Sequence, residues 1–465
     1  MLANWRRALS WLCALALCFS CAGALAEFSP RLSEMAQSDN TTAKISFQLE
    51  SLAPLGASSL QIINDWLGKA EFVVSQGKDA RSEILVDGER AFAAYTRRQQ
   101  GLTLTTFLPS GTSYLTDDKK GDMLSALTGT GMEIPDFSRF PDAYAAVADS
   151  LYDFLQGIVE PKLVKERTSI KYAAASAAYE NYPLTADQMN EAWPGLLEVI
   201  LPALRETLDG QALLYAKAEE TLRALTFSGE CRFKRFLDKE NGDMGMQFTG
   251  VAEKDGDKRK VTLFGGYTPG KGGYISISLP AASGKDNKDN LKITLAAQLT
   301  NKNDIRTLTL EGAYVRKLGD QNAEAELEGT LKNKMADESE SWSGKLTLTQ
   351  TENKVKNVWT LQPELMFQDD GLSGTVRIQR KTGGKVTLKG EAKVLLTTSE
   401  AWEFPQVRSA KNLKDESADR IRQAALEEVS PLAELISQLF SGLSETERTQ
   451  LLHDLRTDEW MNGGM

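Results

Sequence analysis

Residues 227–405 alternate between apolar and polar positions with a period of two. Every odd position from 291 to 299 is apolar, and residues 323–331 and 386–394 repeat the alternation, with one glycine in each. This pattern is typical of antiparallel strands with one covered face and one face in water. We expect about eleven such strands here, forming a large curved sheet that could close into a half-barrel.

A glycine recurs at the centre of these strands, within the pattern apolar-x-Gly-x-apolar. Each glycine has the parity of the apolar residues, so we expect it on the covered face. A glycine in mid-strand weakens a sheet unless the space is needed. Either the sheet curves around its own helices, or its concave face holds an apolar ligand beside the glycines. The candidate ligand-binding residues are Gly229, Gly250, Gly265, Gly312, Gly329, Gly344, Gly374 and Gly390.

The rest of the chain divides by its periodicity. Residues 27–136 predict an N-terminal α+β meander, with a hairpin turn at Asp87-Gly88. Residues 137–226 predict a mainly helical segment, and residues 406–465 predict C-terminal amphipathic helices. The predicted fold class is therefore α+β: a large antiparallel sheet with packed helices, plus a smaller N-terminal α+β layer. Two capping boxes support helix starts, at Thr185 with Gln188 and at Ser444 with Glu447.

Residues 1–26 are typical of a secretory signal peptide. A basic start precedes an apolar stretch, and Ala24-Leu25-Ala26 supplies small residues for cleavage before Glu27. Two alternatives are a retained membrane anchor and a lipoprotein modified at Cys18 or Cys21. The residues before both cysteines depart from the usual lipoprotein pattern. We therefore expect a secreted or extracytoplasmic protein, in the periplasm or at the cell surface.

Composition narrows the range of partners. The chain of 465 residues has 54 Lys and Arg against 64 Asp and Glu, and a pI of about 5.1. This acidic balance argues against nucleic acid and anionic membrane surfaces as partners. Signal cleavage leaves Cys231 as the one thiol, so no intramolecular disulfide is expected. No integral membrane span is expected after cleavage.

Motifs with catalytic chemistry are weak in this sequence. Residues 265–271 nearly match a phosphate-binding loop, but a strand is predicted to follow where a helix is required. Asp238, Glu240 and Asp243 depart from the ligand order of a calcium loop. His453, the one imidazole, lies mid-helix among charged residues. We expect no catalytic residue, no metal and no cofactor, and hence a protein that is not an enzyme.

A helical segment followed by a long curved antiparallel sheet resembles the periplasmic lipoprotein-carrier and mycobacterial lipid-carrier superfamily. The resemblance covers residues 225–440 and, more weakly, residues 40–120. It implies an incomplete barrel that wraps helices and an acyl-chain cavity. The chain is also similar in style to exported proteins of Gram-positive gut bacteria, which implies location. The leading hypothesis is a structural or partner-binding protein of the bacterial cell envelope. The alternative is a carrier or sensor of an apolar ligand, a lipid or lipoprotein acyl chain.

Overall fold

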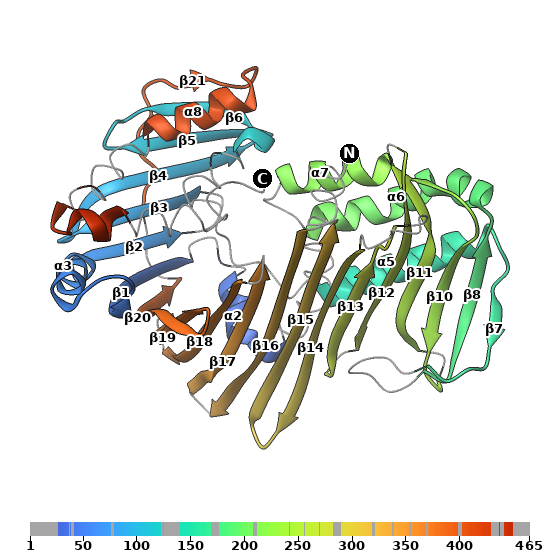
Figure 1. The fold of residues 1–465 in the computed structure, drawn as a ribbon. Coiled ribbons are helices and arrows are strands. Elements are labelled where there is room, and N and C mark those ends of the chain that lie inside the picture. Colours follow the sequence, from blue (N-terminus) through green and yellow to red (C-terminus); the bar gives the residue numbers. More distant parts are fainter. Residues whose placement is uncertain are drawn as a thin grey trace.

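One long β-sheet dominates the computed structural model (Figure 1). Within the described part of the chain the protein is mostly β, with 59% strand and 22% helix, and its 21-stranded sheet is not closed. The predicted α+β class with about eleven strands is therefore wrong. The structure describes residues 27–36, 38, 41–75, 79–121, 124, 140–168, 176–207, 212–240, 242–254, 256–268, 270–281, 290–318, 321–336, 339–352, 355–368, 371–398, 402–428, 437 and 441–449.

The strands are β1 (Thr42–Leu52), β2 (Ala70–Ser75), β3 (Asp79–Val86), β4 (Glu89–Gln99), β5 (Leu102–Leu108), β6 (Ser113–Asp117), β7 (Lys162–Val164), β8 (Ala178–Leu184), β9 (Thr226–Phe227), β10 (Cys231–Leu237), β11 (Asp243–Lys254), β12 (Asp257–Thr268), β13 (Gly272–Ser278), β14 (Asn290–Lys302), β15 (Ile305–Leu318), β16 (Gln321–Ala336), β17 (Ser339–Glu352), β18 (Val355–Gln368), β19 (Gly371–Thr382), β20 (Lys385–Thr397) and β21 (Lys411–Asn412). The helices are α2 (Pro30–Ala36), α3 (Ala57–Leu67), α5 (Phe140–Gln156), α6 (Ala186–Thr207), α7 (Ala212–Arg223) and α8 (Ala418–Glu428).

The sheet is continuous because β1 pairs along its full length with β20, from Thr42 opposite Thr397 to Leu52 opposite Leu388. The strand order is β7–β8–β10–β11 and then consecutive from β12 to β20. It continues through β1 to β6 and ends at the short parallel strand β21. The N-terminal meander therefore extends the large sheet rather than forming a second layer, which accounts for the low strand count expected from the sequence.

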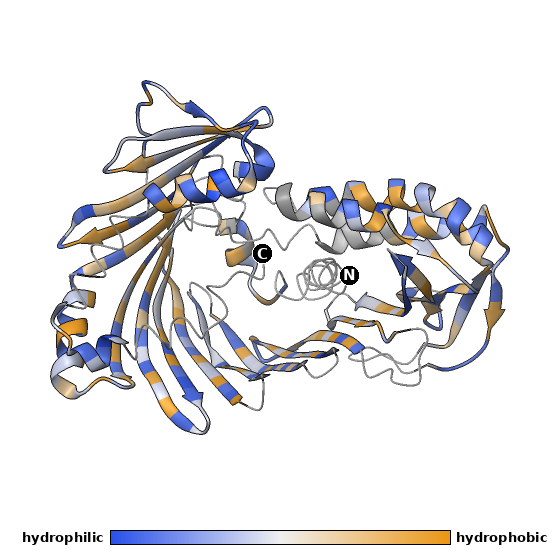
Figure 2. Cartoon of the chain, turned by 45° about the horizontal axis from the view of Figure 1, so that its top comes forward, coloured by the Kyte–Doolittle hydropathy of each residue, from blue (hydrophilic) through white to orange (hydrophobic). Residues whose placement is uncertain are grey.

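The sheet bends along its length, and α5, α6 and α7 lie on its concave side (Figures 1 and 2). The helices bury the apolar face of β8 and β10–β14, with Leu155, Met189 and Leu196 fully enclosed. Cys231 and Tyr182 contribute to the same core from β10 and β8. Hydrophobic burial is the main force that holds such a layer to a sheet.

The other end of the sheet is covered on both faces. Helix α8 packs Ile421 and Ala425 against Phe92 and Phe107 of β4 and β5. On the opposite face, Trp402 lies against Tyr95 at a centroid distance of 5.9 Å. The apolar sequence pattern therefore specifies which side chains are covered, while the covering elements come from distant parts of the chain.

Several local predictions are confirmed. Asp87 and Gly88 both have positive φ, as a two-residue hairpin turn requires. The Thr185 hydroxyl accepts a hydrogen bond from the backbone N–H of Gln188. The Gln188 side-chain oxygen accepts one from the backbone N–H of Thr185, and the two bonds form the predicted capping box.

Candidate functional site: the concave apolar face

The strand register arranges the concave face of β15–β20 in rows that run across the strands. One row contains Gly329, Leu346, Leu361 and Ile378, and continues through Gly390 of β20 to Leu49 of β1. The parallel rows on either side are also largely apolar, and the opposite face is polar. Alternating hydrophobic and hydrophilic positions are visible along these strands in Figure 2.

A short segment, residues 27–36, lies on one end of this face. Phe28 is fully buried there, in a cluster with Leu299, Leu308 and Leu331. Its ring lies 5.2 Å from that of Trp342. Met35, at the end of α2, is buried among residues of β18–β20. No pattern in the sequence marks these residues, because an isolated phenylalanine shows no periodicity.

A buried carboxylate fixes the same segment to the sheet. Oε1 of Glu340, a residue only 3% exposed, accepts hydrogen bonds from Ser29, Asn333 and Trp342, the latter two at 2.8 and 2.9 Å. Asn333 also donates to the Phe28 carbonyl at 2.6 Å. Buried polar groups are costly unless they are paired, so this arrangement specifies one position for the segment.

Glu27, the first residue after the predicted cleavage site, is also fixed to the sheet by hydrogen bonds. Its carboxylate accepts from the Tyr267 hydroxyl and, at 2.8 Å, from the Gly270 N–H. Its carbonyl accepts from Arg306 at 2.7 Å. Burial, together with the Glu27 hydrogen bond, raises the pKa of Tyr267 above its usual range. Ala24 and Ala26, the other two cleavage residues, lie outside the described residues.

Beyond this segment the apolar rows are only partly covered. Eight apolar residues on this face of β16–β20 are only partly buried, although Pro363 and Ala392 beside Val376 are buried. The partly buried residues are Leu327, Leu346, Leu348, Trp359, Leu361, Val376, Ile378 and Leu388.

A polar boundary lies at the hairpin ends of the same strands. Gln350, Asn357 and Thr382 form a row there. Asn357 Oδ1 accepts from the Thr382 hydroxyl at 2.7 Å and from Arg380 Nη2 at 3.4 Å. The Arg380 guanidinium carbon lies 5.2 Å from the centre of the Trp359 ring. No sequence motif marked Arg380, because its position on the apolar face follows from the register.

Most of the predicted glycines lie on the apolar face, and the space beside several of them is filled. A Cβ at Gly329 would lie 2.3 Å from Leu346 Cδ2, and one at Gly312 would lie 3.1 Å from Leu295 Cδ1. At Gly344, Gly374 and Gly390, a strand oxygen would lie within 2.5 Å of the added atom, and at Gly250 the Cys231 sulfur would lie at 2.8 Å. These glycines make room for neighbouring strands and leucines.

Two of the glycines differ from this pattern. Gly229 lies in an exposed bend between β9 and β10 with φ of +78°, so its expected mid-strand position is wrong. Gly265 is in mid-strand on β12, and its nearest neighbour would lie 4.0 Å from an added Cβ. The glycines therefore do not form one uniform stripe.

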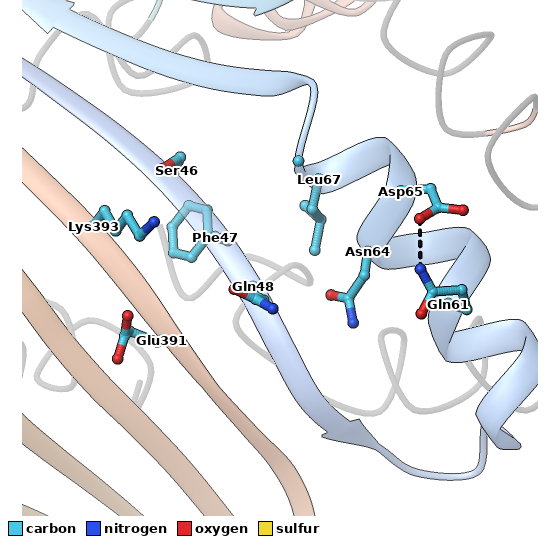
Figure 3. A pocket seen from close by; sticks show the side chains of 10 residues that line it. Ser46, Phe47, Gln48, Gln61, Asn64, Asp65, Leu67, Glu391 and Lys393 are labelled. Carbon is cyan, nitrogen blue, oxygen red and sulfur yellow. Dashed lines mark hydrogen bonds between the residues drawn. The ribbon is translucent and has the colours of Figure 1, made fainter.

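A separate cavity of about 360 Å³ lies between α3 and the edge of β1 (Figure 3). Pairing of β1 with β2 ends at Ile45. Farther along, the Asn64 side chain binds both the N–H and the C=O of Leu49, at 2.8 and 2.7 Å. The Asn64 side chain thus makes the two backbone hydrogen bonds to Leu49 that a neighbouring strand would otherwise make at this edge of β1. The cavity is lined mainly by polar groups, including Gln48, Glu391 and Lys393.

Cys231, Asp238 and Asp243 are among the described residues that the sequence singled out for possible chemistry. Burial raises the pKa of the Cys231 thiol to about 11, so the reactive thiolate is scarce at neutral pH. No group of three or more His, Cys, Asp and Glu side chains among the described residues is arranged to hold a metal. Asp238 and Asp243 accept from backbone N–H groups of their own turn. His453 lies outside the described residues.

Comparison with protein-family models and with curated proteins finds no match for this chain. In the part of the chain that the structure describes, no helix has both the length and the apolar character needed to cross a membrane.

Proposed function

We propose that this chain is an exported, non-enzymatic protein of the cell envelope that holds an apolar ligand against the concave face of its sheet. One observation carries the proposal: apolar rows on β16–β20 continue beyond the buried end of the face, and several of their residues remain partly exposed there. Extended apolar surface of this kind is characteristic of ligand or partner sites. The resemblance to lipid and lipoprotein carriers leads to the same ligand class.

The concave shape supports a ligand rather than a flat partner. Adjacent strands lie about 4.8 Å apart, so the five strands from β16 to β20 span about 19 Å. An acyl chain lying across them would contact Leu346, Leu361 and Ile378, which occupy one row. Each 100 Å² of apolar surface removed from water would contribute about 2.5 kcal/mol before the costs of association.

The test is native mass spectrometry of the exported protein purified from its own host, with organic extraction of any bound species. A stoichiometric lipid or other apolar adduct is expected, and Leu361→Glu should abolish it. Gln362→Glu, on the opposite face of the same strand, is the matched control and should retain the adduct. A protein that stays bare after incubation with a lipid extract would contradict the proposal. The structural or partner-binding alternative would then lead.

A further inference from the structure

The open part of the apolar face ends at residues 27–36, although the rows of the sheet continue beneath this segment. Leu308 and Leu331 lie opposite each other on β15 and β16, and both are buried in one cluster with Phe28. Leu327, four residues away on the same face of β16, is only partly buried. The docked segment, and not the sheet, therefore sets where the open face ends.

Two aromatic rings, those of Phe28 and Trp342, form this border, which we call the aromatic wall. Their centroids lie 5.2 Å apart, and Trp342 packs against the clusters around both Phe28 and Met35. On the same face of β17, Gly344 and then Leu346 follow Trp342, at intervals of about 7 Å. Because Gly344 has no side chain, the wall directly borders the row of Leu346.

A shared acceptor fixes the aromatic wall to the sheet. Oε1 of the buried Glu340 accepts from the Trp342 indole N–H at 2.9 Å and from the hydroxyl of Ser29, the residue after Phe28. Displacing either ring would disturb close packing and leave a buried acceptor without its donor. Rigid borders of this kind distinguish apolar ligands by their shape.

A polar row limits the open face on its other side. On β17, Leu348 follows Leu346, and Gln350 then begins the polar row that Asn357 continues on β18. The open strip therefore holds two rows of β17 leucines between the aromatic wall and the polar row. A slender chain that lies along the row of Leu346 passes beside the wall, whereas a wider group over that row meets the rings.

We propose that Phe28 and Trp342 determine the specificity of the site: they limit the width of the apolar ligand and so select a slender, unbranched chain. This inference rests on the proposed function and adds the shape class of the ligand. It also gives the N-terminal segment a role in binding, because Phe28 completes the site from outside the sheet.

The experiment compares decanol with adamantanol, two neutral alcohols that have equal numbers of carbon atoms but differ in width. Binding to the purified exported protein is followed by tryptophan fluorescence and by calorimetry. The unaltered protein is expected to bind decanol more tightly. Phe28→Ala should raise the affinity for adamantanol relative to decanol by about tenfold, because it opens space beside the row of Leu346. Phe28→Leu, a milder change that keeps the segment apolar, should shift the same ratio less and in the same direction.

Phe236→Ala is the matched control, because it truncates a buried phenylalanine in a separate cluster, beside Met244. It should leave the ratio of the two affinities unchanged even where it lowers stability. If the unaltered protein binds adamantanol as tightly as decanol, or if neither Phe28 variant shifts the ratio, the aromatic wall does not set specificity, while apolar binding stands. If the unaltered protein binds neither alcohol, the proposed function itself fails.

Discussion

Two stretches of the same sheet carry the same alternation but differ in what covers their apolar face. Strands β8 and β10–β14 pack against α5 and α6, which enclose residues such as Leu155 and Leu196. Strands β15–β20 are covered at one end by residues 27–36, and many residues in the remainder of their rows are only partly buried. The first stretch is a closed core, and the second is a partly covered apolar face, on which the proposed ligand site rests. Periodicity alone therefore does not distinguish a core from a site.

The largest expected difference between the two stretches concerns stability. Leu155→Ala, in the helix-covered stretch, should lower the free energy of unfolding by about 2–5 kcal/mol, because it leaves a cavity in a closed core. Leu361→Ala, in the half-exposed rows, should lower it by less than about 1 kcal/mol. Urea unfolding followed by circular dichroism measures both. Equal losses would mean that the middle rows are as firmly packed as the core.

The docked segment can be tested separately from the rows it covers. Asn333→Ala removes the donor to both the Phe28 carbonyl and the Glu340 carboxylate. We expect a loss of about 1–3 kcal/mol in unfolding free energy, and faster proteolysis near residues 27–36, because buried acceptors lose their partner. Lys332→Ala, its exposed neighbour on the opposite face, is the control. An unchanged proteolysis rate would show that other contacts suffice to hold the segment.

These two tests concern features that the sequence predicted to different degrees. The alternation in residues 227–405 predicted an antiparallel sheet with one apolar face, and the capping box at Thr185 predicted the start of α6. The alternation did not predict that the sheet has 21 strands. The N-terminal strands join the large sheet because β1 pairs with β20, and these segments lie more than 330 residues apart in the sequence. Such non-local pairing leaves no local signal.

The candidate site was less predictable than the sheet. Glycine parity led to the apolar face, but the side chains that shape the face are Phe28, Glu340 and Arg380. Each of them acquires its role from a register or contact that spans distant parts of the chain. Within the predicted C-terminal helices, the apolar residues Leu432, Leu435, Ile436, Leu439 and Phe440 lie outside the described residues.

The two kinds of mid-strand glycine allow a sharper test of why glycine recurs. Gly329→Ala should lower the free energy of unfolding by about 1–3 kcal/mol, because the added methyl group would overlap Leu346 Cδ2 at 2.3 Å. Gly265→Ala is the matched variant, since its nearest neighbour lies 4.0 Å away. It should be neutral or slightly stabilising. Tolerance of alanine at Gly329 would show that the glycine is not needed for packing and would return attention to ligand binding.

The smallest expected effect on stability concerns Glu447, whose side chain binds the start of α3. Helix α3 follows β1, the strand that pairs with β20 and so joins the two parts of the sheet. The Glu447 carboxylate accepts from the Ser444 hydroxyl at 2.7 Å and from the Ser59 hydroxyl at 3.0 Å, and Gly56 N–H donates to its other oxygen at 3.3 Å. These hydrogen bonds, led by that of Ser444, lower the pKa of Glu447 to about 2. The folded state therefore favours the charged carboxylate.

Because this pKa is lowered on folding, the contribution of Glu447 is complete above the unfolded value of about 4.3 and is lost as the pH falls towards about 2. Unfolding free energies of the unaltered protein and of Glu447→Gln, measured from neutral pH down to about pH 2, should differ at neutral pH and converge in acid. Glu445→Gln, an exposed neighbour, is the control and should show no such convergence. A difference that stays constant with pH would mean that the Glu447 side chain acts through its shape rather than its charge, and that the hydrogen bonds at α3 do not depend on ionisation.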